Sequence, residues 1–103
     1  MFGTIARVQV APGRKETLRQ VMAEDASAVI PGWIADYLFE SAADPGVCHL
    51  VALFEDEASY IANANSPAQH ERYLKFRACL LEDPQWNDGH VLSAVGPGAH
   101  HTA

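Results

Sequence analysis

The sequence predicts a single α+β domain in the order β-α-β-β-α-β, a ferredoxin-like arrangement with a four-stranded antiparallel sheet and the helices on one face. Its 103 residues are enough for one hydrophobic core and too few for two. Turns rich in proline and glycine separate stretches of β-branched residues from stretches with helical periodicity. We expect the domain to span residues 1–95 and residues 96–103 to form a flexible C-terminal tail.

A strand and a helix open the chain. Residues 2–10 are rich in β-branched side chains and end at a Pro-Gly turn in residues 11–13. Across residues 14–30, apolar side chains recur every three or four positions, which predicts one helix. A second Pro-Gly pair at residues 31–32 ends that helix.

Residues 33–40 predict a half-exposed strand. Strict alternation along this strand places Trp33, Tyr37 and Phe39 on one side. Asp36 then points to the other, solvated side. After a turn at Asp44-Pro45-Gly46, residues 47–54 are almost wholly apolar, as in a strand covered on both faces, and complete a hairpin.

Two helices and a last strand follow the hairpin. The acidic residues 55–57 favour the start of a short helix, because negative charge is stabilised at a helix N-terminus. Ser66 as N-cap and Pro67 in the first turn predict a longer helix that runs to about residue 81. The alternation in residues 90–95 predicts a short final strand, which completes the β-α-β-β-α-β order.

The charge balance narrows the class of partner. Seven Lys and Arg residues stand against thirteen Asp and Glu residues, a net charge of −6, and no basic run is present. We therefore expect no nucleic-acid partner and no membrane partner, since both require cationic clusters. The two cysteines fit reduced core thiols, and the lack of a signal peptide or membrane span predicts a cytoplasmic protein.

The sheet is expected to carry apolar side chains on both faces. Opposite the side that packs against the helices, we expect an apolar set formed by Ile5, Ile34, Leu38, Val51 and Leu53. A bare apolar sheet face is rare in a soluble monomer. Pairing two such faces across a two-fold axis would bury both, so the sequence predicts a homodimer through the sheet face.

Three ionisable residues fall on apolar helix faces. At about 100° per residue, Asp25 lies within roughly 20° of Leu18 on the first helical stripe. On the later helix, the apolar stripe is set by Tyr73, Leu74, Phe76, Leu80 and Leu81. His70 and Arg77 fall within this stripe, whereas Arg72 points away from it. One interpretation is that Asp25 pairs with Arg77 at the rim and that His70 reaches a backbone carbonyl. The other is that these groups exchange protons with a ligand.

Four short stretches carry a resemblance to a known family. They are Ala11-Pro12-Gly13, Ile30-Pro31-Gly32, the run from Phe54 to Tyr60, and Ser66-Pro67. In content and spacing they resemble the antibiotic biosynthesis monooxygenase (ABM) domain family of small dimeric α+β barrels, over about residues 2–95. The resemblance implies this dimeric barrel fold. Members of the family include cofactor-free oxygenases of polyketide phenols, quinol oxygenases, haem-degrading enzymes and many proteins with no known substrate.

Individual family positions are only partly kept. Tyr60 matches a tyrosine of the phenol-oxidising members, but Phe54 stands where these often have tryptophan and Tyr73 where they have arginine. Asn63 matches a position that is also polar in that branch. The Asn-Trp-His set of the haem-degrading branch corresponds to Ala6, Asn63 and Tyr73, so the resemblance does not favour haem degradation.

The resemblance and the misplaced polar residues together predict a cofactor-independent monooxygenase that oxidises an electron-rich aromatic, such as a polyketide phenol, anthrone or quinol, with dioxygen as co-substrate. Apart from a pocket, this chemistry needs a base and donors to a developing oxyanion, and no metal. The predicted catalytic residues are Tyr60 and Asn63 as donors and His70 or Asp25 as base, and the predicted substrate-binding residues are Phe54, Trp33, Tyr73 and Arg77. The alternative is a non-catalytic dimeric barrel that binds a small apolar ligand.

Overall fold

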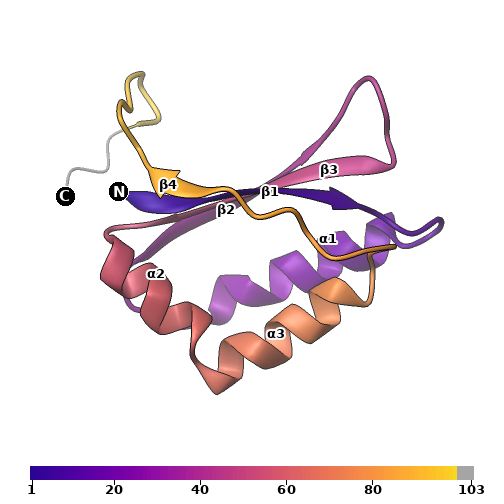
Figure 1. The fold of residues 1–103 in the computed structure, drawn as a ribbon, viewed down its shortest axis with the longest axis horizontal. Helices are drawn as coiled ribbons and strands as arrows, with labels where there is room; N and C mark the ends of the chain where they lie inside the picture. The colour runs from indigo at the N-terminus through magenta and orange to yellow at the C-terminus, as the bar shows by residue number, and fades with distance from the viewer. Residues whose placement is uncertain (100–103) are drawn as a thin grey trace.

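The sheet and helices form two layers (Figure 1). In the computed structural model, which describes residues 1–99, four antiparallel strands lie in the order β2-β3-β1-β4, with α1, α2 and α3 all on one face of the sheet. This confirms the predicted fold class. Residues 100–103, the end of the predicted tail, lie outside the described residues. No helix within residues 1–99 is long and apolar enough to cross a membrane.

The elements follow one another along the chain in the predicted order, apart from one extra helical turn after α1. They are β1 (Phe2–Gln9), α1 (Lys15–Glu24), the 3-10 turn η1 (Asp25–Ser27), β2 (Trp33–Glu40), β3 (Val47–Phe54), α2 (Glu57–Ala64), α3 (Pro67–Arg77) and β4 (Asp88–His90). The predicted bounds of β2 and β3 are confirmed.

Both long helices end earlier than predicted. The first reaches only Glu24, followed by η1, and Ala28 is already extended at ψ 140°. Val29 is 96% exposed, so no apolar contact favours continuing the helix, and a proline follows two residues later. The third helix ends at Arg77 because Leu80 forms a β-bridge with Val10.

The last strand lies earlier than the predicted residues 90–95. β4 pairs with the start of β1, with His90 opposite Phe2. The next backbone N–H, that of Val91, donates to the carbonyl of Met1. β1 itself begins at Phe2, and Leu92 is 99% exposed.

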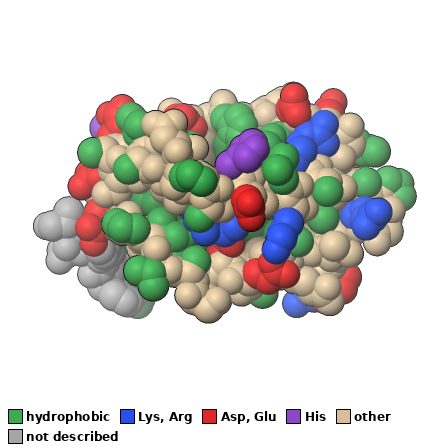
Figure 2. Space-filling model, turned by 90° about the horizontal axis from the view of Figure 1, so that it is seen from below, with side chains coloured by type: hydrophobic (Ala, Val, Ile, Leu, Met, Phe, Trp, Pro, Cys, Tyr) green, Lys and Arg blue, Asp and Glu red, His purple; other side chains and the backbone are tan. Residues whose placement is uncertain are grey.

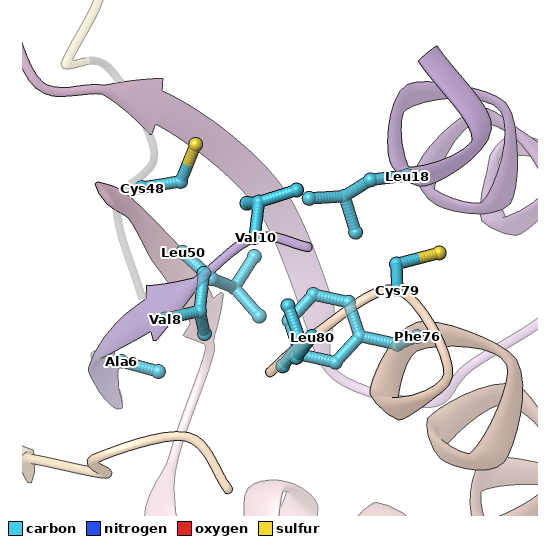
Figure 3. Packing of buried hydrophobic residues seen from close by; sticks show 9 residues of the cluster. All are labelled: Ala6, Val8, Val10, Leu18, Cys48, Leu50, Phe76, Cys79 and Leu80. Atoms are coloured by element: carbon cyan, nitrogen blue, oxygen red, sulfur yellow. The ribbon is translucent and has the colours of Figure 1, made fainter. Parts of the chain in front are cut away.

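The core lies between the sheet and the helices α1 and α3 (Figure 3). Leu18 of α1 is fully buried, and Phe76 of α3 packs with it against the inner face of β1 and β3. The remaining buried members of this cluster are Ala6, Val8, Val10, Cys48, Leu50, Cys79 and Leu80. Burial of these side chains supplies the main favourable free energy of folding.

A β-bulge in β2 changes which side chains share a face. Trp33 pairs with Phe54 and Ala35 pairs with Leu53, so Ile34 has no partner residue on β3. One extra residue reverses the alternation that a regular strand would keep. The predicted placement of Trp33 on the same side as Tyr37 and Phe39 is therefore wrong.

The bulge brings Asp36 and Leu38 to the helix side of the sheet. Both pair with β3 residues of the inner face, Ala52 and Leu50, and Leu38 packs against the core cluster. Asp36 is only partly exposed, so its predicted place on a solvated face is wrong.

The opposite face, which we term the open face, carries Ile5, Tyr37, Phe39, Val51 and Leu53. The first three are exposed large hydrophobic side chains, at 53%, 60% and 65%. An apolar open face is thus present as predicted, with Tyr37 and Phe39 in place of Ile34 and Leu38. Leu38 lies on the inner face, and Ile34, at the bulge, has no partner on β3.

A close backbone approach at Gly3 provides a test of the sheet. A Cβ at this position would lie 2.0 Å from the carbonyl oxygen of Ala52, whereas one at its β4 partner Gly89 would meet nothing within 4 Å. We expect Gly3→Ala to destabilise the protein by about 1–3 kcal/mol or more, by overpacking, and Gly89→Ala to change stability by about 0.5 kcal/mol at most. Urea unfolding of both variants measures this, and equal midpoints would contradict the strand packing.

Candidate active site

A cavity of about 520 Å³ lies between the sheet and all three helices. Its lining is mostly apolar and includes Val21, Met22, Leu50, Phe54 and Phe76. Of the residues predicted for the site, the cavity brings together Asp25, Trp33, Phe54, Tyr60, Asn63, His70 and Tyr73. Seen from the helix side, acidic and basic side chains and a histidine gather near the middle of the surface, among hydrophobic groups (Figure 2).

Arg77 is the predicted site residue that does not line this cavity. Its Nε donates to Oδ1 of Asp83 at 2.8 Å, and its Nη1 donates to the carbonyl of Leu80 at 3.1 Å. The proposed rim pair between Asp25 and Arg77 is wrong. The cation beside Asp25 is Arg72, with Nε 3.7 Å from Oδ1.

Arg72 is the central polar group at one end of the cavity. Its Nε donates to Oε1 of Gln69 at 3.1 Å, and its Nη2 donates to Oδ1 of Asn63 at 3.4 Å. The predicted outward direction of Arg72 is wrong because the inner stripe of α3 follows residues 69, 72, 73 and 76, the i, i+3, i+4, i+7 pattern, all of which line the cavity. Leu74, counted in the predicted stripe, is 53% exposed.

Asn63 lies near the end of α2, where it is oriented by Arg72. Because its carbonyl oxygen accepts from the guanidinium, its Nδ2 group is left without an acceptor in the part of the chain that the structure describes. An amide N–H in this place can donate to a ligand in the cavity. This geometry is compatible with the donor role predicted for Asn63.

Asp25 is the first residue of η1, directly after α1. Burial raises the pKa of its carboxyl group; the positive charge of Arg72 lowers it, while the neighbouring Glu24 raises it further. A partly buried carboxylate beside one arginine can hold a charge or a proton, which is compatible with the role predicted for Asp25.

Asp36 is a second carboxylate in the cavity, which the sequence analysis did not single out. The indole Nε1 of Trp33 donates to its Oδ1 at 3.0 Å. Burial raises the pKa of Asp36, and the hydrogen bond from Trp33 partly opposes this rise. The negative charge of Asp25 raises it further, and Arg72 lowers it. Asp25, Arg72 and Asp36 therefore form one electrostatically coupled group.

Tyr60 and Asp88 form a polar pair elsewhere on the cavity wall. The Tyr60 hydroxyl donates to Oδ1 of Asp88 at 2.9 Å, and its ring contacts Phe2 and Phe54 edge to face at centroid distances of 5.2 and 5.6 Å. Burial, followed by the hydrogen bond to Asp88, raises the pKa of Tyr60 to about 12. Tyr60 is therefore a neutral phenol at physiological pH, with its proton directed at a carboxylate.

Thr4 adds a buried hydroxyl below Tyr60. It lies near enough to offset part of the rise in the pKa of Tyr60, yet its Oγ1 has no partner in hydrogen-bond geometry within the described residues. Thr4 lines the cavity. A buried polar atom without a partner is uncommon, so this hydroxyl is free to bond a ligand or water.

Asp36, Arg72 and Asp88 are the charged residues that sequence reasoning missed as site residues. Arg72 could have been found from the 69, 72, 73, 76 stripe. Asp36 could not have been found from alternation, since the bulge at Ile34 leaves no signal in the order of apolar and polar residues. Trp86 also lines the cavity and contacts Tyr73 at a centroid distance of 6.2 Å.

Comparisons with known proteins agree with this architecture. The family model described as antibiotic biosynthesis monooxygenase matches residues 1–73. No curated protein matches the chain. Among solved structures, SnoaB, a cofactor-independent oxygenase from Streptomyces nogalater, is similar with a TM-score of 0.77 and 16% identity, covering 91% of this chain and 95% of that one.

Two further structures share the fold. A candidate antibiotic biosynthesis monooxygenase from Bordetella bronchiseptica has a TM-score of 0.77 and 21% identity, with 89% of this chain and 97% of that chain covered. Another from Chloroflexus aurantiacus has a TM-score of 0.75 and 18% identity, with coverage of 94% and 98%. At these identities the likeness establishes the fold.

The raised pKa of Asp36 makes a prediction about stability. Protonated Asp36 contributes stability that is fully present below the unfolded-state pKa and is lost as the pH rises through the higher folded-state pKa. Asp36→Asn is uncharged at every pH, so we expect it to be more stable than the wild type at pH 7. The difference should vanish near pH 3, below the ordinary pKa of an aspartate, about 3.9.

Urea unfolding at both pH values measures this effect. Glu71→Gln, on the exposed side of α3, is the matched control because it removes the same charge outside the cavity. A lower urea midpoint for Asp36→Asn at pH 7 would contradict the burial of this carboxylate.

Proposed function

Because the chain belongs to the antibiotic biosynthesis monooxygenase family, we propose that it is a cofactor-independent monooxygenase that oxidises an electron-rich aromatic, such as a polyketide phenol, an anthrone or a quinol, with dioxygen. The observation that carries the proposal is an apolar cavity with carboxylates and hydrogen-bond donors on its wall. Its volume of about 520 Å³ lies within the range of small-molecule sites. The likeness in fold to SnoaB supports the same proposal.

The chemistry needs no external reductant when the substrate supplies the electrons. In an anthrone, the ring methylene loses both C–H bonds and gains one oxygen atom from dioxygen as a carbonyl, while the other oxygen leaves as water. The methylene carbon gives four electrons and dioxygen takes four, so atoms and electrons balance. The protein must therefore accept a proton, stabilise the resulting oxyanion and keep the reacting carbon out of water.

Donors for the oxyanion come from two helices. We assign this role to the Asn63 amide, whose oxygen is held by Arg72, and to the Arg72 guanidinium itself. Tyr60 must leave Asp88 before its hydroxyl can donate to a substrate. Phe54, Trp33 and the remaining apolar wall bury the ring system.

The dimer belongs to this proposal as well. The open face exposes apolar side chains of three adjacent strands, and pairing it with the same face of a second copy would remove them from water. Such a dimer would place the two cavities on the outer sides of the paired sheets, since each cavity lies on the helix side.

We expect Phe39→Asp, on the open face, to convert the dimer to monomer. In a two-fold symmetric interface each protomer contributes one substituted residue, so two charges are buried and the loss in free energy of association is doubled. Sedimentation equilibrium measures the change in dissociation constant. Leu74→Asp, at an exposed hydrophobic position on α3, is the control and should leave the dimer intact. A Phe39→Asp protein that sediments as the wild type would contradict the interface.

Oxygen uptake tests the activity. With 1,8-dihydroxyanthrone under air, we expect one dioxygen consumed per quinone formed. Asn63→Ala should lower kcat by about 10²-fold, the usual effect of removing one oxyanion donor. Asn65→Ala, at the exposed C-cap of α2, is the control and should keep the wild-type rate. Binding of the anthrone without oxygen uptake would instead indicate a non-catalytic ligand-binding barrel.

A further inference from the structure

We propose that Asp36 is the general base of this site and that the Trp33 indole is its positioning residue. The assignment rests on the proposed oxygenase function and names the group that receives the first proton. It differs from the bases that the sequence predicts, His70 and Asp25. The geometry of β2 carries it.

The bulge at Ile34 creates the pair. Residues three apart on a regular strand point to opposite faces. With Ile34 inserted, Trp33 and Asp36 both face the cavity, and the indole Nε1 reaches Oδ1 of Asp36 at 3.0 Å. Bulges frequently redirect side chains beside active sites.

The hydrogen bond from Trp33 makes the two carboxylate oxygens of Asp36 different from each other. Oδ1 is held by the indole, so the side chain of Asp36 has a fixed direction. Within residues 1–99, no donor pairs with Oδ2. Because Asp36 lines the cavity, this second oxygen is the one available to take a proton from a bound ring.

The other candidate bases are committed elsewhere or exposed. Burial raises the pKa of Asp25, but its carboxylate is paired with the Arg72 guanidinium, whose Nε lies 3.7 Å from Oδ1. Asp88 accepts the Tyr60 hydroxyl at 2.9 Å. His70 lies at an exposed position on α3. Asp36 combines a free oxygen with a largely apolar setting.

The surroundings of Asp36 also tune its basicity. Asp25 from η1 and Arg72 from α3 act on its pKa with opposite signs. The remaining titratable groups around the cavity are His70 and Tyr73 on α3, Tyr60 on α2 and Asp88 on β4. Burial raises the pKa of Asp36 and so makes its carboxylate a stronger base than an exposed one. The hydrogen bond from Trp33 limits this rise in the pKa.

The step is a simple proton transfer. One C–H bond of the anthrone methylene breaks, the proton goes to Oδ2 of Asp36, and the electron pair moves through the ring onto the carbonyl oxygen. The product is an enolate, with the negative charge now on the substrate and Asp36 neutral. Asn63 and Arg72 lie in the same cavity to stabilise the enolate oxygen.

Deuterium exchange isolates this step from the chemistry of dioxygen. Under anaerobic conditions in D2O, the base exchanges the methylene hydrogens of 1,8-dihydroxyanthrone, and mass spectrometry follows the label. We expect Asp36→Asn to lower the enzyme-dependent exchange rate by about 10²-fold or more. Glu40→Gln, on the same strand but outside the cavity, should exchange at the wild-type rate. Exchange by Asp36→Asn within about threefold of wild type would overturn the assignment.

A second variant tests the positioning role without removing the carboxylate. Trp33→Phe deletes the donor that lowers the pKa of Asp36, so the acidic limb of the exchange rate against pH should move to higher pH. An unchanged limb would overturn the role of Trp33. Binding of 1,8-dihydroxyanthraquinone to Asp36→Asn, measured by its absorbance, should stay within about threefold of wild type. For Trp33→Phe, a far-UV circular dichroism spectrum matching that of the wild type shows that the fold is kept.

The two proposals fail in different ways. If the wild type exchanges deuterium but consumes no dioxygen under air, the oxygenase function falls and the assignment of the base stands. If Asp36→Asn consumes dioxygen at the wild-type rate, the function stands and the assignment of the base falls. If the wild type binds the anthraquinone and catalyses no exchange, Asp36 is not a base for this class of substrate.

Discussion

One unpaired residue in β2, Ile34, decides what each face of the sheet carries. Side chains alternate with a period of two, so a single insertion exchanges the faces of every residue on one side of it relative to the other. Trp33 and Asp36 thereby meet on the cavity side. Tyr37 and Phe39 thereby lie on the open face. The polar pair and the apolar outer surface are two consequences of the same irregularity.

The polar end of the cavity holds two carboxylates, Asp25 and Asp36, but only one permanently charged cation. Arg72 alone among the residues lining the described cavity carries a permanent positive charge, while Asp25 and Asp36 both lie within its field. Burial raises the pKa of both carboxyl groups, so the free energy of folding becomes less favourable when they ionise. Such an arrangement is retained where reactivity matters more than stability. Replacing the carboxylates by neutral groups would make the fold more stable, but it would remove the groups proposed to take part in proton transfer.

The sequence predicts the fold more fully than the site. The signals for the fold are local, whereas the site depends on contacts between segments that are far apart in the chain. Turns and alternation are local, so the bounds of β2 and β3 follow from the residues themselves. Helical periodicity also places Asp25 near the cavity, and the family resemblance supplies Tyr60 and Asn63. The predicted stripe of α3 includes Leu74, which is exposed, and a stripe centred there directs Arg72 away from the cavity. The position of Asp36 cannot be predicted from the residues of β2 alone, because the bulge depends on how β2 pairs with β3.

The two faces of β2 are not independent in their effect on the site. Asp36 pairs across the sheet with Ala52, and the next residues along the two strands, Tyr37 and Val51, pair on the open face. The backbone that positions the carboxylate is therefore the same backbone that an apposed second sheet would hold. A displacement of about 1 Å in the position of a reacting group can lower the rate by about 10²-fold. The proposed dimer would thus contribute to catalysis without placing any residue in the cavity, by fixing the strand on which Asp36 lies.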